Sequence, residues 1–111
     1  MTELLYTPQA HKDLHDIRSY INEELLNPSA SVNVLTRITK KIRSLAKYPL
    51  MGSALSSIAD VVTDYRYLVC GNYTAFYRYD SNAVYIIRIL YGRRDFMKIL
   101  FGAVLDDNDD Q

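Results

Sequence analysis

Apolar residues recur with two different periods along this chain, and the change of period divides it into two halves. In the first half they recur every three or four residues, as on one face of an amphipathic helix. The positions are Ala10, Leu14, Ile17, Ile21 and Leu25, followed by Val32, Leu35, Ile38, Ile42 and Leu45. Two helices are therefore expected, one beginning at Pro8 and one ending at Tyr48-Pro49.

Local signals mark the starts of both predicted helices. Thr7 can cap the first helix with its hydroxyl, and the proline that follows it is favoured at the first helical position. Asn27-Pro28 interrupts the helical pattern, after which Ser29 or Ser31 can cap the second helix. Because only a few residues join the two helices, they are expected to form an antiparallel hairpin.

In the second half, β-branched and aromatic residues dominate three segments. The segments are 65–70, 73–80 and 84–91. The breaks between them, Gly71-Asn72 and Asp80-Ser81-Asn82, consist of residues that suit tight turns. Three consecutive antiparallel strands are therefore expected, after an irregular connection over residues 49–64.

The order of the predicted elements gives the fold class. A short apolar stretch over residues 4–7 is expected to be a strand, followed by the helical hairpin and the strand meander. Because helices and strands are segregated, the class is α+β, with the hairpin packed on one face of the sheet. Leu68 and Cys70 share one side of their strand and Tyr67 and Val69 the other, and both sides are apolar. Alternation therefore leaves the core face open, and a functional surface is expected on whichever face the hairpin leaves free.

Length and composition limit the class of protein. The 111 residues, 49% hydrophobic and 23% charged, support one globular domain, which we place at residues 1–101. Basic and acidic residues balance at 13 each, but residues 102–111 carry four aspartates and no cation. These last residues are expected to be a disordered acidic tail. An 18-residue apolar run and a signal peptide are both absent, so a cytoplasmic protein without membrane association is expected.

Few residues suit metal or nucleophilic chemistry. His11 and His15 have the spacing of a helical metal pair, but Lys12 stands where a metalloprotease needs a glutamate, and no third ligand is evident. The single cysteine, Cys70, excludes an internal disulfide, and both histidines belong to a distant predicted helix. No metal and no cofactor are therefore expected.

Tyrosine and the cations carry the chemistry of interaction. The chain has ten tyrosines and no tryptophan. Tyrosine rings can stack on nucleic-acid bases, but tyrosine is equally a good residue for half-buried strands. The second predicted helix contributes further cations, which extend a basic surface or simply form a solvated helix face. These are Arg37, Lys40, Lys41, Arg43 and Lys47.

The segment Tyr91-Gly92-Arg93-Arg94-Asp95 is the sharpest local feature. It ends a predicted strand and then presents two adjacent guanidinium groups. Arginine stays protonated, so such a pair clamps phosphate or stabilises a transition state rather than acting as a base. Alternatively, one arginine pairs with Asp95 and only fixes the chain end.

Four short motifs follow the helical hairpin in a fixed order. They are Arg66-Tyr67-Leu68, Gly71-Asn72-Tyr73, Phe76-Tyr77 and the segment 86–95. In this order they resemble the RelE/ParE superfamily, the toxins of bacterial type II toxin–antitoxin modules, also called plasmid stabilisation proteins. The resemblance covers about residues 3–101. It implies a helical hairpin against a curved antiparallel sheet, and growth arrest unless a cognate antitoxin wraps the toxin.

The superfamily divides by target. RelE-like members cut mRNA in the ribosomal A site without a metal, and ParE-like members inhibit DNA gyrase. The resemblance implies that Arg94 takes the place of a RelE-type catalytic arginine and Arg66 that of an active-site lysine. Leu100 stands at the position of the catalytic tyrosine, which leaves Tyr91 as the candidate substitute. Two cations without a clear acid–base pair predict a weak nuclease.

The prediction is therefore a toxin closer to the ParE-like branch. A RelE-like mRNA endoribonuclease and a non-toxic relative that binds only an antitoxin or RNA are the alternatives. Arg93, Arg88 and Arg78 are predicted to bind phosphate or the target. The expected partners are an antitoxin, gyrase or the ribosome with its mRNA, and operator DNA contacted through the antitoxin.

Overall fold

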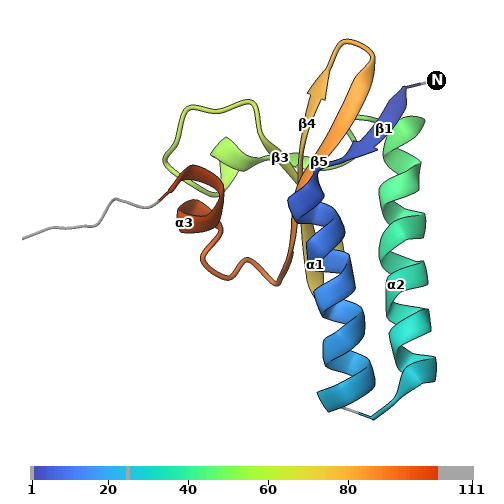
Figure 1. The fold of residues 1–111 in the computed structure, drawn as a ribbon. Coiled ribbons are helices and arrows are strands. Elements are labelled where there is room, and N and C mark those ends of the chain that lie inside the picture. The colour runs from blue at the N-terminus through green and yellow to red at the C-terminus, as the bar shows by residue number, and fades with distance from the viewer. Residues whose placement is uncertain (1, 25, 103–111) are drawn as a thin grey trace, which may run out of the picture.

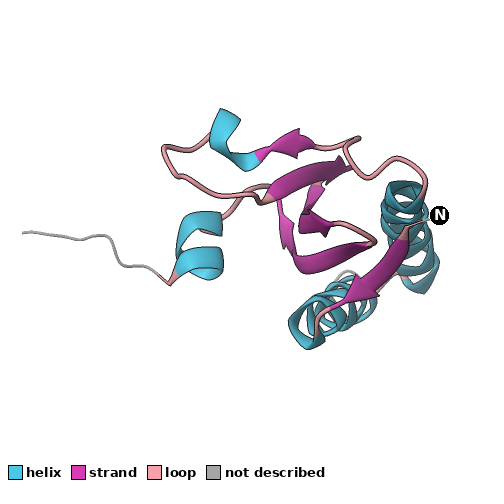
Figure 2. Cartoon of the chain, turned by 90° about the horizontal axis from the view of Figure 1, so that it is seen from above, coloured by secondary structure: helices cyan, strands magenta, loops and turns pink. Residues whose placement is uncertain are grey.

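The chain folds into a five-stranded sheet with a helical hairpin on one face and a short helix on the other (Figures 1 and 2). The computed structural model describes residues 2–24 and 26–102. The elements are β1 (Glu3–Tyr6), α1 (Pro8–Ser19), η1 (Tyr20–Glu24), α2 (Pro28–Arg43), η2 (Ser44–Ala46), β2 (Ser53–Ala54), η3 (Leu55–Ser57), β3 (Arg66–Cys70), β4 (Tyr73–Asp80), β5 (Ala83–Tyr91) and α3 (Phe96–Phe101). This is the predicted α+β class. The predicted acidic tail lies outside the described residues except for Gly102.

Side-chain caps begin both helices of the hairpin. The Thr7 hydroxyl accepts the Ala10 N–H at 3.0 Å, which confirms the predicted cap. In α2 the cap is the Asn27 amide oxygen, which accepts a backbone N–H at 3.1 Å, so the prediction of a cap at Ser29 or Ser31 is wrong. Both helices end in turns of different pitch, η1 and η2, and are therefore shorter than the pattern predicted. Within the described residues, no helix has the length and apolar character needed to cross a membrane.

The strand order is β1-β5-β4-β3-β2. The antiparallel meander of β3, β4 and β5 is the predicted one. In addition, β1 pairs in parallel with β5, from Glu3 opposite Ala83 to Tyr6 opposite Ile86. At the other edge β2 pairs with β3, inside the segment that was predicted to be irregular. Two residues are too few to show alternation, so the sequence pattern could not reveal this strand.

A bulge at Ile87 bends β5. Ile86 and Arg88 are opposite consecutive residues of β4, so Ile87 between them has no partner there. Thr7 occupies the other side of the bulge. Its N–H donates to the Ile86 carbonyl at 3.0 Å and its hydroxyl to the Ile87 carbonyl at 2.8 Å. Bulges disrupt the ladder and increase the local twist, and the pairing of β5 with β1 ends at this point.

Each face of the sheet carries an apolar core. The larger core joins the hairpin to the sheet through Ile17, Ile38, Ile42, Leu68, Cys70, Ala75, Tyr77 and Ile86, among others. The smaller core joins the sheet to α3, where the ring of Phe96 stacks on Phe76 with centroids 5.6 Å apart. Tyr67 packs against this smaller core. The structure therefore resolves which strand residues face the hairpin, and α3 covers part of the face expected to be free.

A buried tyrosine and an arginine hold the loop between α2 and β2. The Tyr77 hydroxyl donates to the Pro49 carbonyl at 2.8 Å and accepts the Gly52 N–H at 3.1 Å. Arg66 Nη2 donates to the Gly52 carbonyl at 2.6 Å. A Cβ at Gly52 would meet the Tyr67 carbonyl and lie 2.7 Å from the Tyr77 hydroxyl. The loop therefore has room only for glycine at this position.

Replacing this glycine is expected to destabilise the fold. Gly52→Ala should lower the free energy of unfolding by about 1–3 kcal/mol, since overpacking forces backbone or side chains to shift. Urea denaturation followed by circular dichroism measures the change. Ser56→Ala, an exposed change in the same connection, is the control and should have almost no effect. Equal stability of the two variants would show that the loop yields without cost.

Candidate functional site

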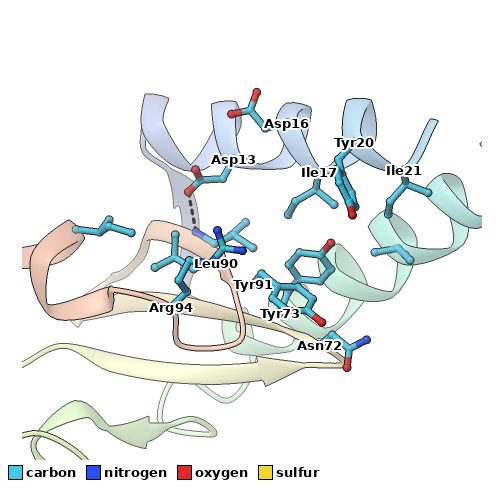
Figure 3. A pocket seen from close by; sticks show the side chains of 13 residues that line it. Asp13, Asp16, Ile17, Tyr20, Ile21, Asn72, Tyr73, Leu90, Tyr91 and Arg94 are labelled. Atoms are coloured by element: carbon cyan, nitrogen blue, oxygen red, sulfur yellow. Dashed lines mark hydrogen bonds between the residues drawn. The ribbon is translucent and has the colours of Figure 1, made fainter. Parts of the chain in front are cut away.

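A groove of about 800 Å³ opens between α1 and the C-terminal end of β5 (Figure 3). It exists because β1 stops opposite Ile86 whereas β5 continues to Tyr91, so that α1 lies beside the last part of β5. The apolar lining residues are Ile17, Ile21, Val34, Ile89, Leu90 and Ile99, and the polar ones are Asp13, Asp16, Tyr20, Asn72, Tyr73, Tyr91 and Arg94. The groove thus combines an apolar surface with tyrosines and a few charges.

A buried carboxylate joins α1 to β5 at one end of this groove. Asp13 Oδ2 accepts Arg88 Nε and the Ile89 N–H, both at 2.8 Å, and Oδ1 accepts Arg88 Nη2 at 2.9 Å. The Ile89 N–H belongs to the part of β5 that β1 does not reach, so the carboxylate stands where a neighbouring strand would be. Hydrogen bonding to Asp13 raises the pKa of the Arg88 guanidinium above its ordinary value, and burial opposes this only in part.

The three arginines predicted to bind phosphate or the target lie in different surroundings. Arg88 is engaged by Asp13, with a quarter of its side chain exposed. Arg78 forms a two-pronged pair with Asp64 on the surface, at 2.9 to 3.2 Å, and this hydrogen bonding lowers the pKa of the Asp64 carboxyl. Arg93 is exposed in the turn after β5 and has no side-chain hydrogen bond within the described residues. Of the three, Arg93 is the one whose guanidinium is open to a ligand.

The structure separates the three residues predicted as a catalytic set. Tyr91 and Arg94 both line the groove. Arg66 aligns across β4 with Ile86, whereas Tyr91 aligns with Cys70, four residues further along β3. Four strand residues span about 13 Å, and two strand spacings add to this distance. Arg66 also donates to loop carbonyls, so its guanidinium is occupied far from the groove.

Three tyrosines form the mouth of the groove. Tyr73 and Tyr91 meet edge to face, with ring centroids 5.5 Å apart, and Tyr20 approaches from η1 (Figure 3). Tyr20 and Tyr91 are more than half exposed. Burial, then the nearby Tyr91 and Tyr20, raises the pKa of Tyr73 above its ordinary value. Its hydroxyl is therefore neutral at neutral pH and serves as a hydrogen-bonding group rather than as a base.

Sequence reasoning identified Tyr91 and Arg94 but missed the opposite wall of the groove. One signal was present: Asp13 lies three residues after Ala10 and four before Ile17, within the apolar stripe of the first helix. A carboxylate on a buried helix face needs a partner, because an unpaired buried charge is costly. That partner, Arg88, follows it by 75 residues and could not be identified by spacing.

The other candidate chemical groups lie away from the groove. Cys70 is buried, and burial raises the pKa of its thiol to about 11, so it is a poor nucleophile at neutral pH. His11 stacks on Tyr6 with centroids 5.3 Å apart, and His15 is exposed. In the described part of the chain, no three His, Cys, Asp or Glu side chains gather as a metal site would require.

Comparison with known proteins gives one family and several similar folds. The family model described as "ParE toxin of type II toxin-antitoxin system, parDE" matches residues 4–96. Among curated protein sequences, none matches this chain.

The similar solved structures come from toxin–antitoxin systems. A chain of the chromosomal ParDE system of P. aeruginosa has a TM-score of 0.70 and 22% identity, covering 83% of this chain and 97% of its own. A chain of the RelBE2 toxin–antitoxin complex of Mycobacterium tuberculosis has a TM-score of 0.61 and 20% identity, with coverages of 81% and 96%. A chain of the E. coli DinJ–YafQ complex has a TM-score of 0.56 and 13% identity, with coverages of 92% and 100%. At these identities the likeness is one of fold.

Removing the charge of Asp13 is expected to destabilise the protein. Asp13→Asn should cost roughly 3 kcal/mol of unfolding free energy, the low end for a broken buried pair, because Arg88 keeps partial contact with water. Thermal or urea unfolding measures the loss. Asp64→Asn breaks the exposed pair with Arg78 and is the matched control, for which about 0–1 kcal/mol is expected. Similar losses in the two variants would contradict a special role for Asp13.

Proposed function

Because this chain belongs to the ParE toxin family of type II toxin–antitoxin systems, we propose that it is a toxin that arrests growth by inhibiting DNA gyrase. A cognate antitoxin neutralises it by occupying the groove beside β5. The observation that supports a binding toxin most directly is the composition of that groove, whose floor is apolar and whose mouth carries three tyrosines.

Such a groove suits a segment of another protein. Tyrosine and arginine are the side chains that most often dominate binding energy at protein interfaces, because each offers a large contact area and a polar end. Tyr20 and Tyr91 flank the mouth, and Arg94 adds a cation whose side chain also lines it. The groove can therefore bury apolar side chains of a partner while the hydroxyls and Arg94 fix their orientation.

The arrangement offers less to a ribonuclease. Cleavage through the RNA 2′-hydroxyl needs cations on the phosphate and groups that move protons at the same place. Arg94 and Tyr91 are together, but Arg66 is remote and holds the loop before β2. A RelE-like ribonuclease would have to rely on Tyr91 and Arg94, which both line the groove. Because these two residues lie together, RNA cleavage is the second candidate function.

The target can be identified by what stops first when the protein is made without an antitoxin. We expect thymidine incorporation to fall within minutes while amino-acid incorporation continues, and the purified toxin to inhibit DNA supercoiling by gyrase. Arg94→Ala should weaken this inhibition about tenfold, since truncation of an interface arginine typically costs 1–2 kcal/mol.

Arg18→Ala is the matched control, because Arg18 is an exposed arginine on α1 that does not line the groove. It should inhibit gyrase as the unchanged protein does, and both variants should keep the melting temperature. Translation-dependent cutting of mRNA with gyrase unaffected would establish the RelE-like alternative. Unchanged growth with soluble protein present would support the non-toxic relative.

The groove is also expected to be the antitoxin site. Tyr91→Ser should weaken antitoxin binding at least tenfold, because it removes a ring from the mouth of the groove. Tyr48→Ser is a matched control, since both tyrosines are 57% exposed and Tyr48 lies after η2, outside the groove. Isothermal titration with the antitoxin encoded beside the toxin gene measures both. Equal loss in the two variants would place the antitoxin elsewhere.

A further inference from the structure

Positive charge is concentrated on α2 and the turn that follows it. Residues 25–59 contain five cations and no aspartate or glutamate. All five are exposed: Arg37, Lys40, Lys41, Arg43 and Lys47. None of them takes part in an ion pair within the described residues. The carboxylates of α1 that line the groove are instead both paired, Asp13 with Arg88 and Asp16 with Lys12.

The five cations form one surface, which we call the basic face of α2. At 100° per residue, Lys40, Arg43 and Lys47 lie opposite the buried residues Ile38, Ile42 and Leu45. Arg37 lies at the side of this arc, and Lys41 lies beside the buried face. The face extends over about ten residues, or roughly 15 Å. A DNA duplex carries a phosphate charge about every 1.7 Å along its axis, so a surface of this length meets several phosphates.

Stabilisation of the helix itself accounts for only part of this pattern. Cations in the last turn of a helix interact favourably with its dipole, which explains Lys40, Lys41 and Arg43. Arg37 lies before that turn, and Lys47 follows η2. Moreover, the helix dipole gives no reason why acidic residues should be absent from the whole of residues 25–59. The helix dipole therefore does not account for the whole of the basic face.

From these observations we propose that the basic face of α2 binds the phosphate backbone of duplex DNA. Four of the five cations stand on one helix, which fixes their spacing and suits a duplex with fixed phosphates. Single strands instead bind on exposed aromatic platforms. The aromatic ring next to the face is that of Tyr48, and the Lys47 ammonium lies over it, 5.7 Å from its centroid. The choice of DNA over RNA rests on the proposed function as a toxin and on the partner expected from the sequence, operator DNA contacted through the antitoxin.

The basic face and the groove can be occupied at the same time. In Figures 1 and 2, α2 lies on the side of the molecule away from α3, whose residue Ile99 lines the groove. Of α2, Val34 lines the groove and none of the five cations does, so a protein segment in the groove leaves these cations exposed. In a toxin–antitoxin complex on DNA, α2 would add sequence-independent contacts to those of the antitoxin.

Fluorescence anisotropy with a labelled 24-base-pair duplex of arbitrary sequence tests the proposal on the purified full chain. The logarithm of the affinity should fall linearly with the logarithm of salt concentration, because binding releases counterions. Lys40→Gln/Lys47→Gln should lower this slope by about two and weaken binding at least tenfold at low salt. The charge-matched control Lys12→Gln/Lys98→Gln changes exposed lysines of α1 and α3 and should bind as the unchanged protein does.

Three outcomes would overturn the proposal. The first is no binding by the unchanged protein at 50 mM salt, and the second is equal loss in the two double variants. The third is binding of an RNA duplex or of polyglutamate as tightly as DNA. Gyrase inhibition is measured on the same preparations. Lost DNA binding with intact inhibition in Lys40→Gln/Lys47→Gln supports the basic face, and absent inhibition with DNA binding retained refutes only the proposed target.

Discussion

The contact between Asp13 and the end of β5 determines how the rest of this small fold is arranged. Beyond the bulge at Ile87 the edge of β5 has no neighbouring strand, and a bare strand edge needs hydrogen-bond partners. Asp13 supplies one to the Ile89 N–H and binds Arg88 with both oxygens. The cost of removing both charges from water offsets much of the attraction in a buried ion pair, so such a pair adds little net stability compared with apolar packing. Here it holds α1 beside β5, and the space left between them is the groove.

The sequence was informative where one residue pattern extended over a whole element. The helical stripe and the alternating strands predicted the hairpin and the meander, and Thr7 marked the first cap. It was uninformative where an element depended on a distant partner. The two-residue β2, the parallel pairing of β1 with β5 and the bulge at Ile87 all follow from tertiary contacts. The groove itself requires β1 to end before β5 does, and no local pattern encodes that difference.

The arginines show why residue type and position alone give an incomplete picture of a site. Arg66 was predicted to be catalytic and Arg88 to bind phosphate or the target. In the structure, Arg66 holds the loop before β2 and Arg88 pairs with Asp13. Both use the same property that suits arginine to phosphate, a planar set of donors that binds two acceptors at once. Arg93 and Arg94 differ because Gly92 and Asp95, both with positive φ, form a turn that carries them past the end of the strand.

The near-zero net charge of the chain conceals a division between two surfaces. At the groove the carboxylates are paired, Asp13 with Arg88 and Asp16 with Lys12, whereas the cations of α2 are exposed and take part in no ion pair within the described residues. Because salt screens charges more than about 10 Å apart, each surface presents its own local charge to a partner rather than the average of the whole. A protein that must bind one macromolecule tightly while approaching a second, polyanionic one benefits from this separation. The hairpin achieves it because α1 places its paired carboxylates at the groove, whereas none of the five cations of α2 and the turn after it lines the groove.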